Sequence, residues 1–330
     1  MLVFGRRAEF AAKTSVPENG QKRDLRLIAE NRHHFRTVVK VPDGLEEILV
    51  EVRNEAGRGV DARIPVVASL QSVGTVGEKY GVVIGISEYQ ADSETLPNLR
   101  FADDDSRAIR DLLLSEAGGF RPGNVITLID ADATSRNMRS ALSTFLTRPK
   151  KEDLVLISFA GHGAADPNNP MDHYFITHDS RPKDLGGTAF PMWHLRDVFA
   201  HTIKAERVIT FADACHSAGI GEAAVEGFNL VNQSFQRYAS IEGRAVLTGS
   251  DLGESSFEAE KWGGGHGVFT YFLLKGVSGP ADRNGDRRIT VQELFNYIQS
   301  EVAQETEGVQ NPVMMPGGLS GQALFNLGAL

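Results

Sequence analysis

Two stretches, DLVLISFAGHG (153–163) and ERVITFADACHSAG (206–219), decide the fold predicted for this chain of 330 residues. Each begins with a continuous apolar run, which is typical of a strand buried on both faces of a sheet. Each run ends among small residues that surround a reactive side chain, His162 in the first stretch and Cys215 in the second. Because the carboxyl ends of parallel strands share one edge of a sheet, we expect both side chains at that edge.

Similar apolar runs occur on both sides of these stretches and alternate with segments of helical spacing. This alternation predicts an α/β domain over residues 78–330, with a mostly parallel sheet flanked by helices on both faces. Besides the two strands above, the expected strands are 80–86, 125–130 and 245–250, and the expected helices are 101–114, a segment capped by Thr134 and running to about 145, 192–201, 267–276 and 290–303.

The first 77 residues follow another pattern and predict a small β-rich segment ahead of the α/β domain. FRTVVKV (35–41) and EILVEVR (47–53) alternate in period two around the turn residues Pro42-Asp43-Gly44, which indicates a β-hairpin. Residues 65–79 are expected to form a linker. Because two strands alone are marginally stable in water, this segment either packs on the main domain or is the remnant of a β-sandwich.

The charge of the chain is unevenly divided and restricts the classes of partner. The chain has 34 Lys and Arg against 43 Asp and Glu, a net charge of −9, to which the first 77 residues contribute +2 and the remainder −11. Such an acidic body argues against nucleic acid and suits cationic substrates or metal cations. No run of eighteen apolar residues and no signal-peptide pattern occurs, so we expect no membrane partner, and either a cytoplasmic protein or a piece of a longer one.

Cys215 is the single cysteine of the chain, so no internal disulfide can form, and it is either a small buried side chain or a nucleophile. A thiol nucleophile needs an imidazole that accepts its proton and later protonates the leaving amine. His162 lies 53 residues upstream and is the candidate base. The adjacent His216 is rejected because neighbouring side chains diverge on an extended backbone. The backbone N–H groups of Gly163 and Cys215 are the candidate donors for the oxyanion.

A strand ending in GHG, a gap of about fifty residues and a strand ending in DACHSAG together resemble the metacaspases and bacterial caspase-like peptidases. The resemblance covers roughly residues 78–325 and continues in GHGVFTYFLLKG (265–276) and NPVMMPGG (311–318). It implies a caspase-like fold and a cysteine endopeptidase that acts through His162 and Cys215. No cofactor is then required for the chemistry.

The resemblance also implies protein or peptide substrates cleaved after Arg or Lys, because metacaspases bind the basic residue with two acids. Asp105 and Asp213 stand at the matching positions, and carboxylates suit a desolvated guanidinium. Other interpretations stay open, since the acids around Asp105 also complement a helix N-terminus and Asp213 can be a structural acid. Ala160 stands where metacaspases usually carry Ser, a departure that bears on the choice between Arg and Lys.

A candidate calcium loop runs from Asp282 to Glu293 and leads into an expected helix. The spacing of its polar residues is that of an EF-hand, but Arg287 occupies the position where a Gly makes the sharp turn. The alternative is an Asx-rich turn that caps a helix beginning near Thr290. The candidate ligands are Asp282, Asn284, Asp286, Arg288, Thr290 and Glu293.

Self-processing is expected in the polar stretch 220–244, with Arg237 as the expected site, because caspase-like peptidases often cut themselves in such a segment. Two other classes of function stay open. One is a catalytically silent caspase-fold module for binding or signalling, and the other is a calcium-responsive module with an inert Cys215. An esterase is not supported, because the sequence has no G-x-S-x-G motif.

Overall fold

The computed structural model describes residues 76–91, 96–166, 169, 171–213, 234–235, 243–251, 254, 256–315 and 317–328, together with five strands nearer the N-terminus. The chain divides into two compact units, Met1–Gln71 and Ser72–Leu330. None of the helices in the described part of the chain is long and apolar enough to cross a bilayer.

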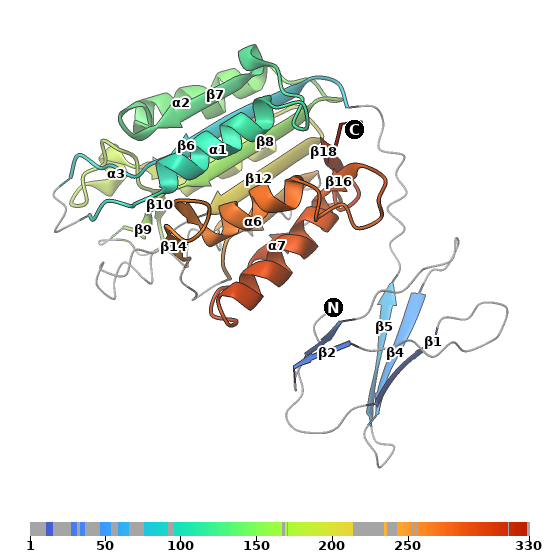
Figure 1. The fold of residues 1–330 in the computed structure, drawn as a ribbon. Helices are drawn as coiled ribbons and strands as arrows, with labels where there is room; N and C mark the ends of the chain where they lie inside the picture. Colours follow the sequence, from blue (N-terminus) through green and yellow to red (C-terminus); the bar gives the residue numbers. More distant parts are fainter. Residues whose placement is uncertain are drawn as a thin grey trace. The chain divides into compact units, whose positions relative to one another are not determined.

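In the first unit, β4 (Glu47–Arg53) lies between β1 (Ala11–Ser15) and β5 (Gly59–Pro65) in an antiparallel sheet (Figure 1). The strand predicted at 47–53 is confirmed, but the hairpin predicted between it and residues 35–41 is wrong. Both edges of β4 are occupied by β1 and β5, because GVDARIP (59–65) alternates like β4 and follows it after a short loop that contains a Gly. A separate ribbon pairs β2 (Ile28–Asn31) with β3 (His34–Arg36).

The second unit is built on a six-stranded sheet of order β17-β13-β12-β8-β6-β7 (Figure 1). The five strands from β13 to β7 are parallel, and β17 pairs antiparallel with β13. The predicted α/β class with a mostly parallel sheet is confirmed, and the antiparallel edge strand is an addition to it. The strands are β6 (Lys79–Gly85), β7 (Val125–Ile129), β8 (Leu154–Ala160), β12 (Arg207–Asp213), β13 (Arg244–Thr248) and β17 (Val313–Met315).

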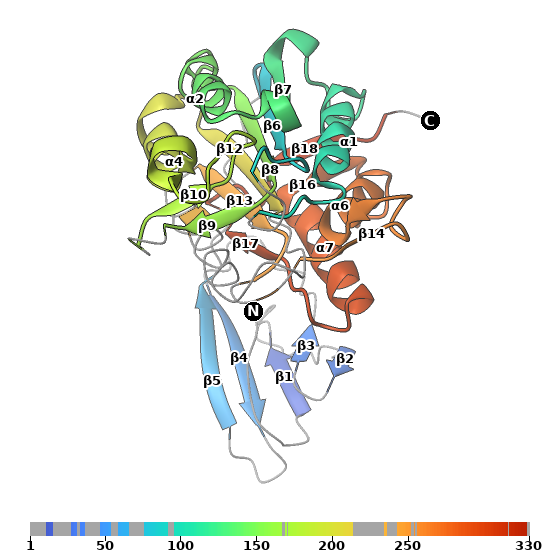
Figure 2. The same cartoon turned by 90° about the vertical axis from the view of Figure 1, so that its left-hand side faces the viewer.

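Alternate residues of these strands pack into two cores, one on each face of the sheet. In β8, Val155 and Ile157 join one core, whereas Leu154 and Leu156 join the other. Two-sided burial is the reason that the strands read as continuous apolar runs. Helices α2 and α4 cover the first face, and α1, α6 and α7 cover the second (Figure 2). The helices are α1 (Ala102–Leu114), α2 (Ser135–Ser143), α4 (Met192–Asp197), α6 (Val268–Val277) and α7 (Val291–Glu305).

The predicted helix starts are confirmed at two caps. The Thr134 side chain accepts from the N–H of Asn137 at 3.2 Å and begins α2. Thr290 and Glu293 form a reciprocal capping box at the start of α7. The helix predicted at 192–201 is divided, because α4 continues as a π-helical turn, Val198–Thr202.

Arg244 of β13 links the π-helical turn to the sheet through hydrogen bonds. Its buried guanidinium donates to the carbonyls of Phe199, Ile203 and Ala205 at 2.9–3.2 Å, and burial lowers the pKa of Arg244. These carbonyls end the helical segment, where a cation is favourable. The stretch 220–244 was expected to be loop-like, but its last residue is the first of β13.

Short strands complete the unit, and their two to four residues give too little periodicity for prediction from sequence. They are β9 (Gly163–Ala165), β10 (His173–Phe175) and β11 (Phe190–Pro191) in one antiparallel sheet, β14 (Glu258–Ala259) with β15 (His266–Gly267), and β16 (Arg288–Thr290) with β18 (Ala323–Asn326); the remaining turns are α3 (Leu185–Thr188), Pro122–Asn124, Asp130–Asp132 and Phe145–Thr147.

Candidate active site

His162 lies between the end of β8 and the start of β9, with 1% of its surface exposed. Its ring stacks on Tyr89, with ring centroids 5.1 Å apart and planes at 27°. Its Nε2 lies 2.8 Å from the carbonyl oxygen of Pro97. A carbonyl oxygen can only accept, so Nε2 carries the proton and Nδ1 is the basic atom of the neutral ring.

Tyr89 fixes His162 from two directions. Its hydroxyl accepts from the His162 N–H at 2.9 Å and donates to the carbonyl of Ile86 at 3.1 Å. Its own N–H donates to Asn98 Oδ1 at 3.0 Å, next in sequence to the Pro97 that holds the imidazole. A Cβ on Gly161 would lie 3.2 Å from the Tyr89 hydroxyl, so the glycine permits this close approach.

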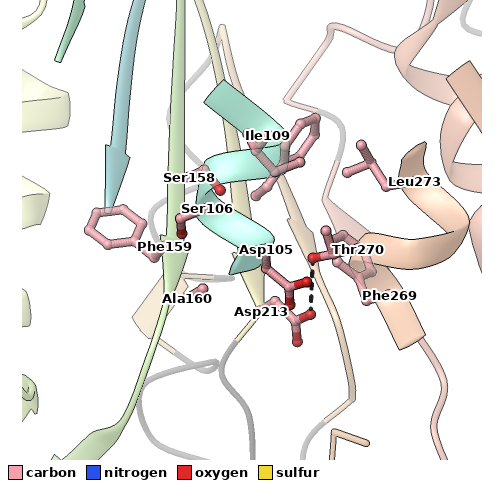
Figure 3. A pocket seen from close by; sticks show the side chains of 11 residues that line it. Asp105, Ser106, Ile109, Ser158, Phe159, Ala160, Asp213, Phe269, Thr270 and Leu273 are labelled. Carbon is pink, nitrogen blue, oxygen red and sulfur yellow. Dashed lines mark hydrogen bonds between the residues drawn. The ribbon is translucent and has the colours of Figure 1, made fainter. Parts of the chain in front are cut away.

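Asp105 and Asp213 lie side by side although 108 positions separate them in the sequence (Figure 3). Asp105 is in the first turns of α1, on the same stripe as the buried Ile109 and Leu113. Asp213 ends β12, opposite Ala160 of β8 in the parallel register. The two acids are 1% and 3% exposed. Charged side chains this deeply buried are rare without a partner, which marks the pair as a candidate site.

Each carboxylate has its own set of donors. Asp213 accepts from the hydroxyl of Ser256 at 2.8 Å and from that of Thr270 at 3.4 Å. Asp105 lies 2.7 Å from His266 Nδ1 and accepts from the N–H of Gly267 at 3.1 Å. A small cavity beside the pair is enclosed by α1, α6 and the ends of β8 and β12 (Figure 3); it is lined by Asp105, Ser106, Ile109, Ser158, Phe159, Ala160, Phe211, Asp213, Phe269, Thr270 and Leu273.

Burial dominates the electrostatics of the pair. It raises the pKa of Asp105 to about 6, against the lowering effect of His266. It raises the pKa of Asp213 to about 7, and the neighbouring charge of Asp105 adds to the rise. Burial also raises the pKa of Glu258, which accepts from the backbone at the start of α1. These raised pKa values favour a shared proton on the pair near neutral pH, and a cation bound between the two carboxylates would displace it.

The three acids in the first turn of α1 have different roles. Asp103 accepts from the hydroxyl of Ser87 at 2.6 Å, and Asp104 is exposed at the helix N-terminus. Both fit the helix-terminus interpretation, whereas Asp105 turns inward to Asp213. Gly163 is the first residue of β9. Cys215 and Arg237 lie outside the described residues.

Sequence reasoning missed several residues that hold the site. Tyr89 and Pro97 give no periodic signal, because they lie in loops that approach His162 only in three dimensions. His266 and Gly267 lie within the quoted stretch 265–276 but had no assigned role. Gln310 was also missed; it is fully buried and donates to Ser256 at 3.0 Å, so the C-terminal segment supports a donor of Asp213.

In the candidate calcium loop, side-chain oxygens accept from the loop's own backbone. Asp282 accepts from the N–H groups of Gly285 and Arg287 at 3.0 and 2.9 Å. Arg287, at the position expected to be Gly, has φ of 66°. Glu293 is engaged in the capping box, so the helix-capping interpretation is confirmed. The described residues contain no group of three or more His, Cys, Asp or Glu side chains arranged to hold a metal ion. Calcium binding stays a prediction.

The other four candidate ligands have different surroundings. Asn284 accepts from the N–H of Asp286 at 2.7 Å, and Asp286 accepts from that of Arg288 at 2.8 Å. Arg288 is exposed, and Thr290 is the cap of α7. Titration of the chain with calcium, followed by calorimetry, tests whether these groups exchange their backbone donors for a cation.

A mostly parallel sheet with a histidine and a buried acid pair at its carboxyl edge is the arrangement expected of a caspase-like domain. A family model of the caspase domain matches residues 78–322. The chain belongs to this family, which is one of cysteine peptidases.

Three metacaspases of Arabidopsis thaliana are similar to the chain. Metacaspase-4 is 25% identical over 202 residues, which cover 56% of this chain and 43% of that protein. Metacaspase-6 is 28% identical over 155 residues, 45% of this chain and 40% of that protein. Metacaspase-7 is 28% identical over 115 residues, 33% of this chain and 28% of that protein. The chain thus spans less than half the length of each.

The fold is also similar to the crystal structure of protein GSU0716 from Geobacter sulfurreducens. The TM-score is 0.53 at 17% sequence identity, over 76% of this chain and 100% of that one. At this identity the likeness concerns the fold alone.

Proposed function

We propose that the chain is a cysteine endopeptidase that cleaves after Arg or Lys, with Cys215 as nucleophile and His162 as its base. The observation that carries the proposal is the buried pair of Asp105 and Asp213 at the strand edge that also holds His162. The histidine supplies the base, and the acid pair supplies a counter-charge for a basic side chain.

The strand register supports the pairing of His162 with Cys215. Asp213 and Ala160 are register partners on adjacent parallel strands. Cys215 follows Asp213 by two residues, and His162 follows Ala160 by two. We expect two segments that leave neighbouring strands at the same level to keep residues close together when they lie equally far from the register partners.

The orientation of the imidazole supports its role as a base. With Nε2 donating to the Pro97 carbonyl, Nδ1 is the nitrogen that can take the proton of the Cys215 thiol. The thiolate then attacks the scissile carbonyl, and the same nitrogen returns the proton to the leaving amine. Water hydrolyses the resulting acyl-enzyme by the same transfers in reverse order.

The Gly163 N–H is a suitable oxyanion donor, together with that of Cys215. Ile176 donates to the carbonyl of His162, and Asp166 donates to that of Asp172, both at 2.8 Å. Because backbone groups alternate along a strand, the N–H of Gly163 points away from β10. An N–H that no ladder uses can stabilise charge that develops in the transition state.

The acid pair is the proposed pocket for the P1 residue, the substrate residue after which the chain is cleaved; it is called the P1 pocket below. A guanidinium or ammonium that leaves water needs charged acceptors, and two carboxylates can share the donors of one guanidinium. An acidic P1 side chain would meet two like charges instead, which is costly at low dielectric. Ala160 lines the cavity without a hydroxyl, so the choice between Arg and Lys rests on these two acids.

Paired fluorogenic peptides that end in Arg, Lys or Asp test the proposal, with and without calcium, in wild type and Cys215→Ala. We expect cleavage after Arg or Lys that is lost in the variant. Cleavage after Asp would retain the dyad and contradict the pocket. No cleavage of any peptide would favour the catalytically silent module.

Gly267→Ala is expected to lower kcat/KM for an Arg peptide by at least about tenfold, about 1.4 kcal/mol. Its φ of −63° suits alanine, but the added Cβ would lie 2.8 Å from Asp213 Oδ2 and 2.9 Å from Asp105 Oδ2. The methyl group thus displaces the carboxylates of the pocket. Gly321→Ala is the matched control, because nothing lies within 4 Å of its Cβ. Equal kcat/KM for wild type and Gly267→Ala would contradict the pocket.

Self-processing after Arg237 is part of the proposal. Arg244, the other basic residue of the stretch 220–244, is buried with its guanidinium on backbone carbonyls, which opposes cleavage there. After long incubation with calcium, wild type should give two fragments on a denaturing gel. Arg237→Gln and Cys215→Ala should stay intact, and an intact wild-type band would contradict self-processing.

A further inference from the structure

The contact between His266 and Asp105 takes no part in the transfer of protons between His162, Cys215 and the substrate. Nδ1 of His266 lies 2.7 Å from Asp105 Oδ1, and the imidazole side chain is 18% exposed. His266 belongs to β15, which the ribbon with β14 holds against the start of α1. The fold therefore places an ionisable base at the rim of the acid pair, 161 residues away in sequence.

We propose that His266 is a positioning residue of the P1 pocket, which holds Asp105 as a carboxylate turned toward Asp213 so that both acids can accept from one basic side chain. This role rests on the proposed preference for a basic P1 residue, and it adds His266 to the residues that determine that preference.

The geometry gives each oxygen of Asp105 a separate task. His266 occupies Oδ1, and the N–H of Gly267 lies 3.3 Å from Oδ1 and 3.1 Å from Oδ2. A Cβ on Gly267 would come within 3 Å of Oδ2 of Asp105 and Oδ2 of Asp213. The Oδ2 atoms of the two acids thus flank one glycine, and the histidine fixes the rotation of the Asp105 carboxylate.

The charges around His266 support the same role. Asp104 and Asp105 act on it from α1. Glu258, the cross-strand partner of Gly267 in β14, and Asp213 of β12 act on Asp105 instead. The hydrogen bond to Asp105 raises the pKa of His266. Two adjacent buried acids without a cation share a proton, because both cannot ionise. A charged His266 offsets one acid and leaves one net negative charge for one positive P1 side chain.

His266→Asn separates charge from hydrogen bonding, because the asparagine amide can donate from near the position of Nδ1 but carries no charge. We expect its KM for an Arg peptide to rise about tenfold at pH 6.5, the effect of one pKa unit on Asp105. As pH rises, the acids ionise unaided and wild-type His266 loses its charge, so the two proteins should converge. The kcat should stay near that of wild type. His266→Leu removes donor and charge, so its KM should exceed that of His266→Asn at every pH.

His194→Asn is the matched control, since His194 contacts the hydroxyl of Ser143 at 2.6 Å and belongs to α4. Its KM should not change. Equal and pH-independent losses in His266→Asn and His266→Leu, or no loss in either, would overturn the positioning role. Thermal melting of both variants shows whether they remain folded.

Binding of agmatine, a guanidinium on a short alkyl chain, separates this role from peptidase activity. It is measured by calorimetry at pH 6.5 in Cys215→Ala with and without His266→Asn. About tenfold weaker binding with His266→Asn supports the role even where no peptide is cleaved. Equal agmatine binding by the two proteins overturns the positioning role, and so does the absence of binding by the protein that carries Cys215→Ala without His266→Asn. Absence of cleavage in wild type with the agmatine difference intact would instead contradict the proposed function.

Discussion

His162→Asn is expected to lower kcat/KM for an Arg peptide by at least about a thousandfold, as the loss of one member of a catalytic unit does. The ring that Pro97 and Tyr89 orient would then be missing, so no group takes the thiol proton or returns it to the leaving amine. The loss should fall on kcat more than on KM, because Asp105 and Asp213 are unchanged. Progress curves with the fluorogenic peptides measure it, and a circular dichroism melt verifies the fold.

Alkylation of the thiol gives a second measurement of the same variant. Cys215 is the single cysteine of the chain, so iodoacetamide consumption reports on that residue alone. An adjacent imidazole makes a thiol reactive below the range in which a free thiol ionises, about pH 8.5. We therefore expect wild type to react at pH 6.5 at least about tenfold faster than His162→Asn. Equal rates would show that the two residues do not form a dyad.

Tyr89→Phe should give an intermediate result. It keeps the ring that stacks on His162 and removes the hydroxyl that accepts from the His162 N–H. The hydroxyl makes two buried hydrogen bonds, to His162 and to Ile86, and its loss costs about 1–3 kcal/mol, so kcat should fall at least about tenfold. A loss of kcat as large as that of His162→Asn would contradict this prediction, because it would show that the stacked ring does not orient His162 without the hydroxyl.

The core of the second unit could be predicted because its signals are local. Strands buried on both faces read as apolar runs, and Thr134 and Thr290 cap helices within three residues of their partners. The N-terminal hairpin was assigned to the wrong pair of strands, because the turn signal at Pro42-Asp43-Gly44 does not show which strands pair with β4. The short strands around the site gave no signal at all.

The candidate site could be predicted only where a motif or a resemblance marks a residue. His162 follows an apolar strand between two glycines, and Asp105 and Asp213 stand where metacaspases carry their two acids. His266 and Ser256 have no such signal; they become part of the site through contacts that span 161 and 43 positions. Long-range contacts of this kind follow from how the strands and helices pack, which one sequence does not reveal.

Asp213→Asn is expected to have opposite effects on activity and stability. Asparagine keeps the shape of the side chain and removes the charge, so a basic P1 residue loses one of its two carboxylates. Breaking a buried ion pair costs about 3–5 kcal/mol, so kcat/KM for an Arg peptide should fall at least about a hundredfold, mainly through KM. Asp153→Asn is the control, because Asp153 is equally buried but accepts backbone N–H groups at the opposite end of β8.

The pH dependence of stability gives the sign of the second effect. Burial raises the pKa of Asp213 to about 7 in the folded protein, against about 3.9 in an unfolded chain. The folded state therefore binds the extra proton between these values, and the contribution of this carboxyl to stability is lost as pH rises through about 7. Asp213→Asn has no such loss. Its free energy of unfolding should match that of wild type near pH 4 and exceed it by at least about 1 kcal/mol at pH 8.

Denaturant unfolding followed by tryptophan fluorescence measures this difference, because Trp193 and Trp262 both belong to the second unit. Asp153→Asn should not gain stability at pH 8, since its carboxylate is stabilised by backbone donors that an amide satisfies less well. A variant that loses activity and gains stability would mark Asp213 as a residue kept for binding at a cost to the fold. If Asp213→Asn is instead less stable at pH 8, the acid is a structural member of the strand end, and the pocket must be sought elsewhere.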